Sequence, residues 1–153
     1  MKIYIIAVGK VKNKSYLEEI DNYIKQLPYP FIIHEVKDEP VKEGMVREKD
    51  NIIKKIPKDS YVICLDRKGK EFDSIKFASH LENLITTSKK DIVFIIGGSY
   101  GIHKDLLNAA DEKLSFSKFT FPHQLMRLIL VEQIYRAFKI MENHPYHKWG
   151  YND

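Results

Sequence analysis

Residues 91–141 read DIVFIIGGSYGIHKDLLNAADEKLSFSKFTFPHQLMRLILVEQIYRAFKIM, and this third of the chain decides the fold. An apolar run at 92–96 is followed by a glycine turn at 97–101 and then by a short helical stretch. A second apolar segment at 114–121 precedes Pro122, which suits the first turn of a long helix. Two strand ends and a candidate ligand loop are therefore expected close together in this region.

The first ninety residues predict the sheet and helices that support this region. The predicted strands are residues 2–8, 31–36, 61–65 and 92–96, and the predicted helices start near 15, 45, 73 and 122. Ser15 and Glu18 have the spacing of a capping box, and residues 66–70 look like a turn. Strands that alternate with helices indicate an α/β fold with a mainly parallel sheet flanked by helices. We expect one domain over residues 1–153, because neither an internal repeat nor a flexible linker interrupts the pattern.

The composition favours a soluble protein with an anionic partner. The formal net charge is +4 and the sequence pI is about 9.0, as is common among proteins that bind nucleic acid. No apolar run approaches the length of a membrane span, and the N-terminus has no signal-peptide pattern. The single cysteine, Cys64, lies in an apolar run and cannot form an intrachain disulfide. A cytoplasmic protein that does not associate with membranes is expected.

The glycine turn is the richest candidate for a ligand loop. In parallel sheets ligands bind beyond the carboxyl ends of the strands, where residues 9–10, 66–70 and 97–101 are all candidates. Glycines at 97–101 would let the backbone approach a ligand, but a tight strand-to-helix turn explains them equally well. The G-x-G-x-x-G order is missing, so NAD is not expected. A phosphate-binding nucleotide enzyme is disfavoured too, because G-x-x-x-x-G-K-[ST] is absent.

The long helix and the segment before it carry further signals. Apolar alternation shifts its phase within 114–121, which indicates a bulge or a strand end with free backbone groups. The helix is apolar on two sides, and we interpret its two neighbours as its own sheet and a second subunit. Arg127 lies on the apolar stripe, where an ion pair and an anionic substrate remain equal alternatives. Arg136 is expected to pair with Glu132 one turn earlier.

The C-terminal tail combines histidine, tyrosine, lysine and tryptophan. Such side chains offer acid/base groups, stacking surfaces and phosphate contacts, although a frayed terminus is the simpler alternative. His144 and His147 have a spacing that could bind metal. No cysteine or acidic cluster accompanies them, so a metal site is not expected.

Several ordered motifs carry a resemblance to a known family. They are AVGK at 7–10, GGS-x-G at 97–101, LSFSK-x-TFPHQ at 114–124, EQ-x-YRA at 132–137 and YHK at 146–148. Together they closely resemble the ribosomal RNA large subunit methyltransferase H family, which belongs to the SPOUT class of methyltransferases. The resemblance covers the whole chain.

This resemblance implies a C-terminal trefoil knot, a homodimer and S-adenosylmethionine (S-adenosyl-L-methionine) as methyl donor. It also implies methylation of N3 of a pseudouridine in large-subunit (23S) ribosomal RNA, with free RNA or an assembled ribosome as the partner. The cofactor-binding positions that it implies are Leu65, Gly97, Phe116, Ser117, Lys118, Phe119, Thr120 and Phe121. The expected catalytic residues are Tyr146, His147 and Arg127, and the expected substrate-binding residues are His123 and Lys148.

The chemistry that follows from this resemblance is an in-line displacement, in which the protein chiefly positions donor and nucleophile. N3 of pseudouridine must lose a proton, which requires a base or stabilisation of the developing anion. We expect the tail to act on the partner subunit's site, and the extension at 149–153 to leave that site open or to stack on RNA. The alternative is a non-catalytic protein that binds RNA or the ribosome through its basic surface.

Overall fold

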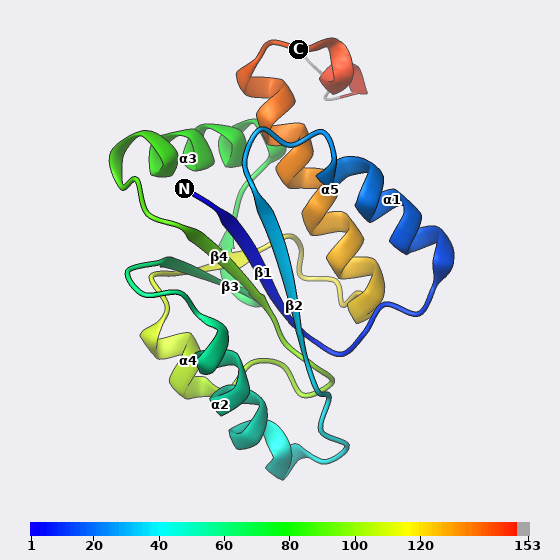
Figure 1. Cartoon of the computed structure of the whole chain (residues 1–153), viewed down its shortest axis with the longest axis vertical. Helices are drawn as coiled ribbons and strands as arrows, with labels where there is room; N and C mark the ends of the chain where they lie inside the picture. Colours follow the sequence, from blue (N-terminus) through cyan, green and yellow to red (C-terminus); the bar gives the residue numbers. More distant parts are fainter. Residues whose placement is uncertain (150–153) are drawn as a thin grey trace.

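A five-stranded parallel sheet forms the centre of the computed structural model, which describes residues 1–149 apart from the side chains of Lys148 and Trp149. The strand order is β2-β1-β4-β3-β5 (Figure 1). The strands are β1 (Ile3–Val8), β2 (Phe31–Val36), β3 (Tyr61–Glu71), β4 (Ile92–Ile96) and β5 (Glu112–Ser115). Every pairing between neighbouring strands is parallel, which confirms the predicted α/β class with a sheet flanked by helices.

Helices cover both faces of the sheet (Figure 1). One face carries α1 (Lys14–Ile24), α3 (Ser74–Thr87) and α5 (His123–Met141), and the other carries α2 (Met45–Lys55) and α4 (Lys104–Ala109). Two short 3-10 turns, η1 (Lys42–Gly44) and η2 (Pro145–Trp149), complete the described chain. Among the described residues, no helix is long and apolar enough to cross a membrane.

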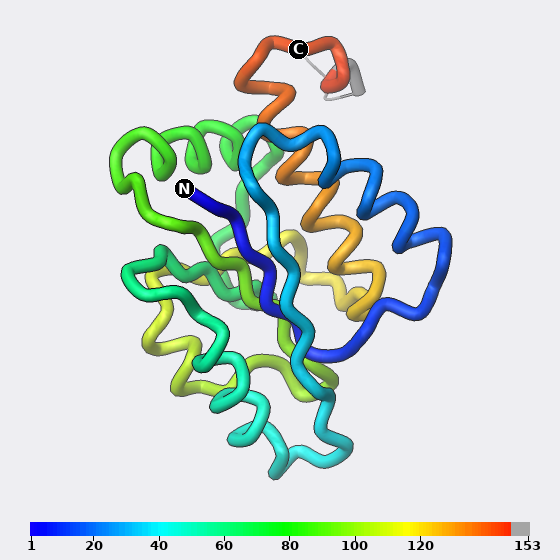
Figure 2. Tube along the Cα trace, in the orientation of Figure 1, coloured from blue at the N-terminus to red at the C-terminus, as the bar shows by residue number. Residues whose placement is uncertain are grey.

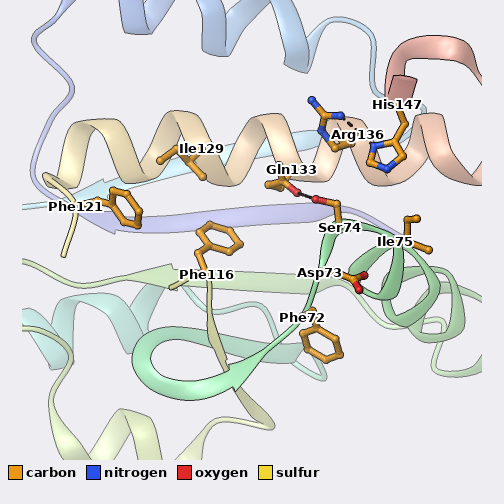
Figure 3. Close-up of a pocket in the computed structure, with 10 residues that line it drawn as sticks. All are labelled: Phe72, Asp73, Ser74, Ile75, Phe116, Phe121, Ile129, Gln133, Arg136 and His147. Atoms are coloured by element: carbon orange, nitrogen blue, oxygen red, sulfur yellow. Dashed lines mark hydrogen bonds between the residues drawn. The ribbon is translucent and has the colours of Figure 1, made fainter. Parts of the chain in front are cut away.

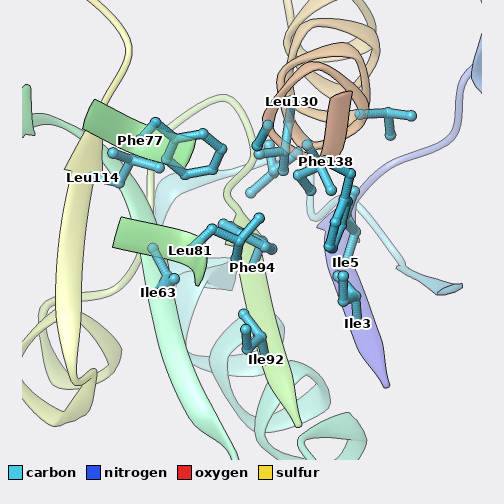
Figure 4. Close-up of a cluster of buried hydrophobic side chains, with 14 of the residues drawn as sticks. Ile3, Ile5, Ile63, Phe77, Leu81, Ile92, Phe94, Leu114, Leu130 and Phe138 are labelled. Atoms are coloured by element: carbon cyan, nitrogen blue, oxygen red, sulfur yellow. The ribbon is translucent and has the colours of Figure 1, made fainter. Parts of the chain in front are cut away.

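The two central strands are buried on both faces because their sequences are almost continuously apolar. Along each strand, alternate side chains enter opposite cores. Ile5 and Phe94 belong to the larger core under α1, α3 and α5, which Figure 4 shows, whereas Ile6 and Ile95 belong to the smaller core under α2 and α4. The buried thiol of Cys64 lies in the smaller core.

Two predicted boundaries in the first half of the chain are wrong, and each has a local physical reason. Helix α1 begins before Ser15, because the side chain of Asn13 accepts a hydrogen bond from the backbone N–H of Tyr16 (3.2 Å) and caps the helix. Residues 66–70 are not a separate turn but part of β3. Leu114 pairs with both Leu65 and Lys70, so β3 bulges between those two positions.

The predicted strand at 114–121 is shorter than expected. Strand β5 ends at Ser115, and residues 116–121 leave the sheet. The Ser115 hydroxyl donates to the carbonyl of Ser117 (3.0 Å), and the Ser117 hydroxyl accepts from the N–H of Phe119 (3.0 Å). Local side-chain hydrogen bonds of this kind compete with a strand ladder. The phase shift in the sequence therefore marks the end of the strand.

Helix α5 finds its lateral neighbours within the chain. It lies between α1 and α3 on the sheet, and the tube in Figure 2 shows α1 and α5 running side by side. Tyr135 packs on Tyr23 of α1 with ring centroids 5.0 Å apart, and the amide oxygen of Gln133 accepts a hydrogen bond from Ser74 of α3 (2.7 Å). These contacts cover Tyr135, whereas Leu128, Ile129 and Ile140 on the same helix are only half-buried. A second subunit as a further neighbour of α5 stays a prediction.

Candidate functional site

A cleft of about 400 Å³ opens at the carboxyl edge of the sheet, where β3, β4 and β5 end or bulge. Three chain segments, 65–67, 96–102 and 114–121, form its walls together with the start of α5. Parallel strands deliver their carboxyl ends to one edge, so segments that are distant in sequence meet there. The lining residues include Leu65, Gly97, Phe116, Ser117, Phe119, Thr120, Phe121 and His123.

All but one of the residues that are expected to bind the cofactor line this cleft. Lys118 is not among the residues that line it. Phe119 lines its rim, with 77% of the side chain exposed. The cleft also includes Arg67, which sequence reasoning treated as part of a turn and did not identify. One Arg67 Nη donates to the hydroxyl of Thr120 (3.3 Å) and joins two of the walls.

The glycine turn is both tight and part of the cleft wall. Gly98 and Gly101 form an isolated bridge, in which the N–H of Gly101 donates to the Gly98 carbonyl (3.0 Å). Gly101 has a φ of +84°, which glycine adopts without strain. A Cβ added to Gly97 would lie 2.6 Å from the backbone carbonyl atoms of Gly101. A tight strand-to-helix turn and a loop that lets the backbone approach a ligand are therefore compatible interpretations of residues 97–101.

A second cavity of about 550 Å³ adjoins the first and includes the tail (Figure 3). Phe116 and Phe121 line both cavities and separate them. His147 and Arg136 line the other end of the second cavity. A single chain thus brings the expected catalytic histidine into a space that shares walls with the cleft.

His147 has a defined hydrogen-bonding state in this cavity. An Arg136 guanidinium nitrogen lies 3.0 Å from His147 Nδ1. A guanidinium only donates, so Nδ1 accepts and the proton of the neutral ring is on Nε2. Nε2 is buried and has no hydrogen-bond partner within the described part of the chain. Arg136 is itself held by Glu132 at 2.8 and 3.1 Å, which confirms the predicted i,i+4 pair.

Tyr146 is anchored on α5 and is poorly suited to act as a base. Its hydroxyl donates to a carboxylate oxygen of Glu132 (2.8 Å) and lies 3.2 Å from the hydroxyl of Tyr23. Arg136 lies over its ring, 4.8 Å from the centroid. Burial, followed by the hydrogen bonds to Tyr23 and Glu132, raises the pKa of Tyr146 above its ordinary value, so the phenol stays protonated at neutral pH. The tail is packed on α5 as far as His147.

Arg127 lies far from the tail. It is 5% exposed, its guanidinium pairs with the carboxylate of Glu35, and one Nη donates to the Gly9 carbonyl (3.0 Å). Arg136 lies nine positions further along α5, which corresponds to about 14 Å along the helix. Within one chain, Arg127 therefore does not lie in the same site as Tyr146 and His147. The side chain of Lys148 and the segment 150–153 lie outside the described residues.

The Arg127–Glu35 pair should contribute substantially to stability. We expect Glu35→Gln to lower the free energy of unfolding by about 1–2 kcal/mol, because the Arg127 guanidinium is buried but the Glu35 side chain is 35% exposed and water screens the pair. Urea denaturation measures this change. Glu18→Gln, an exposed substitution on α1, serves as the control and should change stability by less than about 0.5 kcal/mol. Equal free energies of unfolding for the two variants would contradict the stabilising role assigned to the Arg127–Glu35 pair.

Histidines and acidic residues do not gather into a metal site in the described chain. No group of three or more His, Cys, Asp or Glu side chains there could hold a metal ion. The cleft instead offers glycine backbone, apolar side chains and the irregular segment 116–121.

Comparisons with known proteins identify the family of this chain. The family model described as "Predicted SPOUT methyltransferase" matches residues 1–147. The ribosomal RNA large subunit methyltransferase H of Acholeplasma laidlawii (strain PG-8A) is 50% identical over 148 residues, 97% of this chain and 100% of that protein. The protein of the same name from Lysinibacillus sphaericus (strain C3-41) is 46% identical over 159 residues, with the same coverage.

A solved structure supports the fold. The probable methylase family protein from Haemophilus influenzae Rd KW20 superposes with a TM-score of 0.56 at 13% identity, over 94% of this chain and 69% of that one. Identity this low bears on the fold alone, whereas the family model and the two relatives span the motifs that line the cleft. The chain therefore belongs to the SPOUT methyltransferases and, within them, to the ribosomal RNA large subunit methyltransferase H family.

Proposed function

We propose that this methyltransferase transfers a methyl group from S-adenosylmethionine to N3 of a pseudouridine in large-subunit (23S) ribosomal RNA. One observation carries the proposal: all of the residues expected to bind the cofactor except Lys118, which are scattered over residues 65–121, converge on one cleft of about 400 Å³. The names of the two close relatives support a ribosomal RNA substrate. We expect the activity in the cytoplasm, where ribosomes are found.

The cleft fits the proposed cofactor in its chemistry. Leu65, Phe116 and Phe121 supply apolar walls, and Gly97 lets the backbone come close. Residues 116–121 have left the sheet, so their backbone N–H and C=O groups can bond to a purine edge. When bound, S-adenosylmethionine supplies a methyl group on a positively charged sulfur. Phe119 enters the proposal as a contact at the rim, whereas Lys118 does not line the cleft and enters only as a position implied by the family resemblance.

The chain's own contribution is to position the target base and stabilise its charge. We assign His147 to this task as a hydrogen-bond donor, because Arg136 occupies Nδ1 and leaves the buried Nε2–H without a partner in the described chain. Tyr146 holds the tail on α5 through Glu132. His123, which lines the cleft at the start of α5, is proposed to contact the substrate together with Lys148.

The proposal extends to a trefoil knot and a homodimer. The three segments that interlace in such a knot would be the three walls of the cleft, which come from 65–67, 96–102 and 114–121. Exposed apolar side chains beside the second cavity, such as Ile75 at 50%, offer a surface for a partner subunit. In a dimer, Arg127 of one subunit could serve the site that the other subunit's tail completes.

If each active site combines the cleft of one subunit with the tail of the other, two variants with different defects should complement each other in a mixed dimer. A variant that lacks residues 144–153 and a Gly97→Ala variant should each have little activity as homodimers when the S-adenosylmethionine concentration is kept near the wild-type dissociation constant. If the tail acts on the partner's cleft, a mixture of the two should recover about a quarter of the wild-type activity, because half of the dimers are mixed and each retains one intact site. Methylation of ribosomal RNA by the mixture measures this recovery. No recovery in dimers shown to be mixed would place the tail in the site of its own subunit.

Calorimetry separates the proposed enzyme from a non-catalytic RNA-binding protein. We expect S-adenosylmethionine to bind the full chain with a stoichiometry near one per cleft, in the absence of RNA. A protein that only binds RNA has no use for this ligand, so an absence of binding heat would support the alternative. ATP serves as the control ligand, and binding of ATP in place of S-adenosylmethionine would contradict the proposal.

A further inference from the structure

A third cavity, of about 610 Å³, lies at the carboxyl ends of β1 and β2 beside the start of α5. We propose that it is a nucleotide subsite, which holds a phosphate-bearing nucleotide of the RNA substrate next to the methyl-transfer cleft. This inference rests on the proposed function, because it assigns the ligand from the class of substrate. Its volume lies within the range of about 300–1,000 Å³ that is usual for small-molecule sites.

Arg127 gives the cavity a buried donor without a partner. The residue lines the cavity and is 5% exposed, and its Nε has no hydrogen-bond partner within the described chain. A buried donor left unsatisfied costs about 1–3 kcal/mol. The Arg127 Nε is enclosed by protein atoms, so a ligand acceptor removes this cost when the neighbouring side chains move aside. Glu35 and Gly9 hold the other guanidinium nitrogens in place. The donor is therefore fixed in position before any ligand arrives.

The start of α5 adds a second feature suited to an anion. Pro122 is the N-cap of this 19-residue helix, and in the described chain no side chain there accepts from the N–H groups of the first turn. Those N–H groups and the helix dipole favour a phosphate. Gln124 lines the same cavity, and its amide oxygen accepts from the N–H groups of Lys12 (2.7 Å) and Asn13 (3.1 Å). The loop after β1 is thus attached to the helix start.

Charge at the rim favours a polyanionic ligand. Lys10, Lys12 and Lys37 line the cavity with exposed side chains, opposed by Asp38 and by Glu35, which already pairs with Arg127. Lysines that neutralise phosphates release counterions, which favours RNA over a neutral ligand. His123 lines this cavity and the cleft, so the two sites are neighbours. A chain of nucleotides could occupy both.

A titration of the full chain with uridine 5′-monophosphate tests the subsite. We expect the Arg127 Nε–H signal and the backbone amide signals of His123 and Gln124 to shift together in nitrogen–proton NMR spectra, with one dissociation constant. A Lys10→Gln/Lys12→Gln double variant should weaken that constant about tenfold. Lys14→Gln, an exposed change on α1 outside the cavity, should leave it unchanged.

Three results of this titration would overturn the subsite: no shift at Arg127, equal binding by the double variant, or equal affinity for inorganic phosphate, which would indicate a simple anion site.

Enzyme assays keep this test separate from the proposed function. The double variant should raise KM for large ribosomal subunits about tenfold and lower the salt slope of RNA binding by roughly 1–2 units, with unchanged S-adenosylmethionine affinity. If S-adenosylmethionine does not bind but the nucleotide does, only the proposed function fails. If methylation proceeds and KM does not change in the double variant, only the subsite fails.

Discussion

Gly97→Ala should weaken the binding of S-adenosylmethionine by about 100-fold, or ~2.7 kcal/mol, which is within the range for an overpacked site. The added Cβ would lie 2.6 Å from backbone carbon and oxygen of Gly101 and 2.8 Å from a side-chain carbon of Ile102. Backbone atoms cannot rotate away as a flexible side chain can, so the turn must open. Gly101 and Ile102 line the cleft, and their displacement would change its wall. Calorimetry measures the loss.

The neighbouring glycine provides a matched control for this prediction. A Cβ on Gly98 would meet side-chain atoms, Val8 Cγ1 at 2.9 Å and Asp38 Oδ1 at 3.1 Å. Gly98→Ala should therefore weaken binding by less than about tenfold, because the contacts are longer than those at Gly97 and involve the side chains of Val8 and Asp38 instead of the backbone of the turn. Thermal unfolding of both variants shows whether the fold is retained. A Gly97→Ala protein that is folded and binds S-adenosylmethionine like the wild type would show that the glycine turn is not part of the cofactor site.

His147→Ala should lower kcat about 100-fold while leaving the affinity for S-adenosylmethionine unchanged. The reason is the Nε2–H donor, which Arg136 orients by occupying Nδ1 and which has no other partner in the described chain. Removal of one well-placed donor from a site where negative charge develops has an effect of about this size in other enzymes. Single-turnover methylation of ribosomal RNA measures the chemical step directly.

The Tyr146→Phe variant distinguishes a chemical role of the Tyr146 hydroxyl from a role in anchoring the tail on α5. It removes hydrogen bonds to Glu132 and Tyr23 but keeps the ring that Arg136 covers. Because the raised pKa of Tyr146 excludes it as a base at neutral pH, we expect a fall in kcat of less than about tenfold and a stability loss of about 1 kcal/mol. If Tyr146→Phe were inactive and His147→Ala active, the roles assigned to the two residues would be wrong.

The sequence predicts the sheet well because its strands are buried on both faces. Residues 31–36 and 92–96 coincide with β2 and β4, and α3 begins near residue 73 as predicted, where Asp73 caps it. Continuous apolar runs of strand length and a capping aspartate are local signals that tertiary packing rarely overrides. The glycine turn and the segment 114–121 lie close together as predicted, since strand ends in a parallel sheet share one edge, whereas their role in ligand binding stays a prediction.

Other features depend on contacts that no local pattern encodes. Glu35 pairs with Arg127 from 92 positions away, so the sequence alone leaves an ion pair and an anion site as equal alternatives. The β3 bulge depends on the register with Leu114, and Gly69 fits there because a Cβ would lie 2.6 Å from the Lys113 carbonyl carbon. Periodicity shows that α5 is apolar on several sides, but it cannot show that α1 and α3 cover the flanks.

Nucleoside mass spectrometry of large-subunit ribosomal RNA, from cells with and without this gene, tests the central claim most directly. We expect N3-methylpseudouridine in the RNA of wild-type cells and its loss in the deletion strain. The wild-type gene should restore the signal, and the Gly97→Ala gene should not. An unchanged methylpseudouridine signal in the deletion strain would contradict the proposed function.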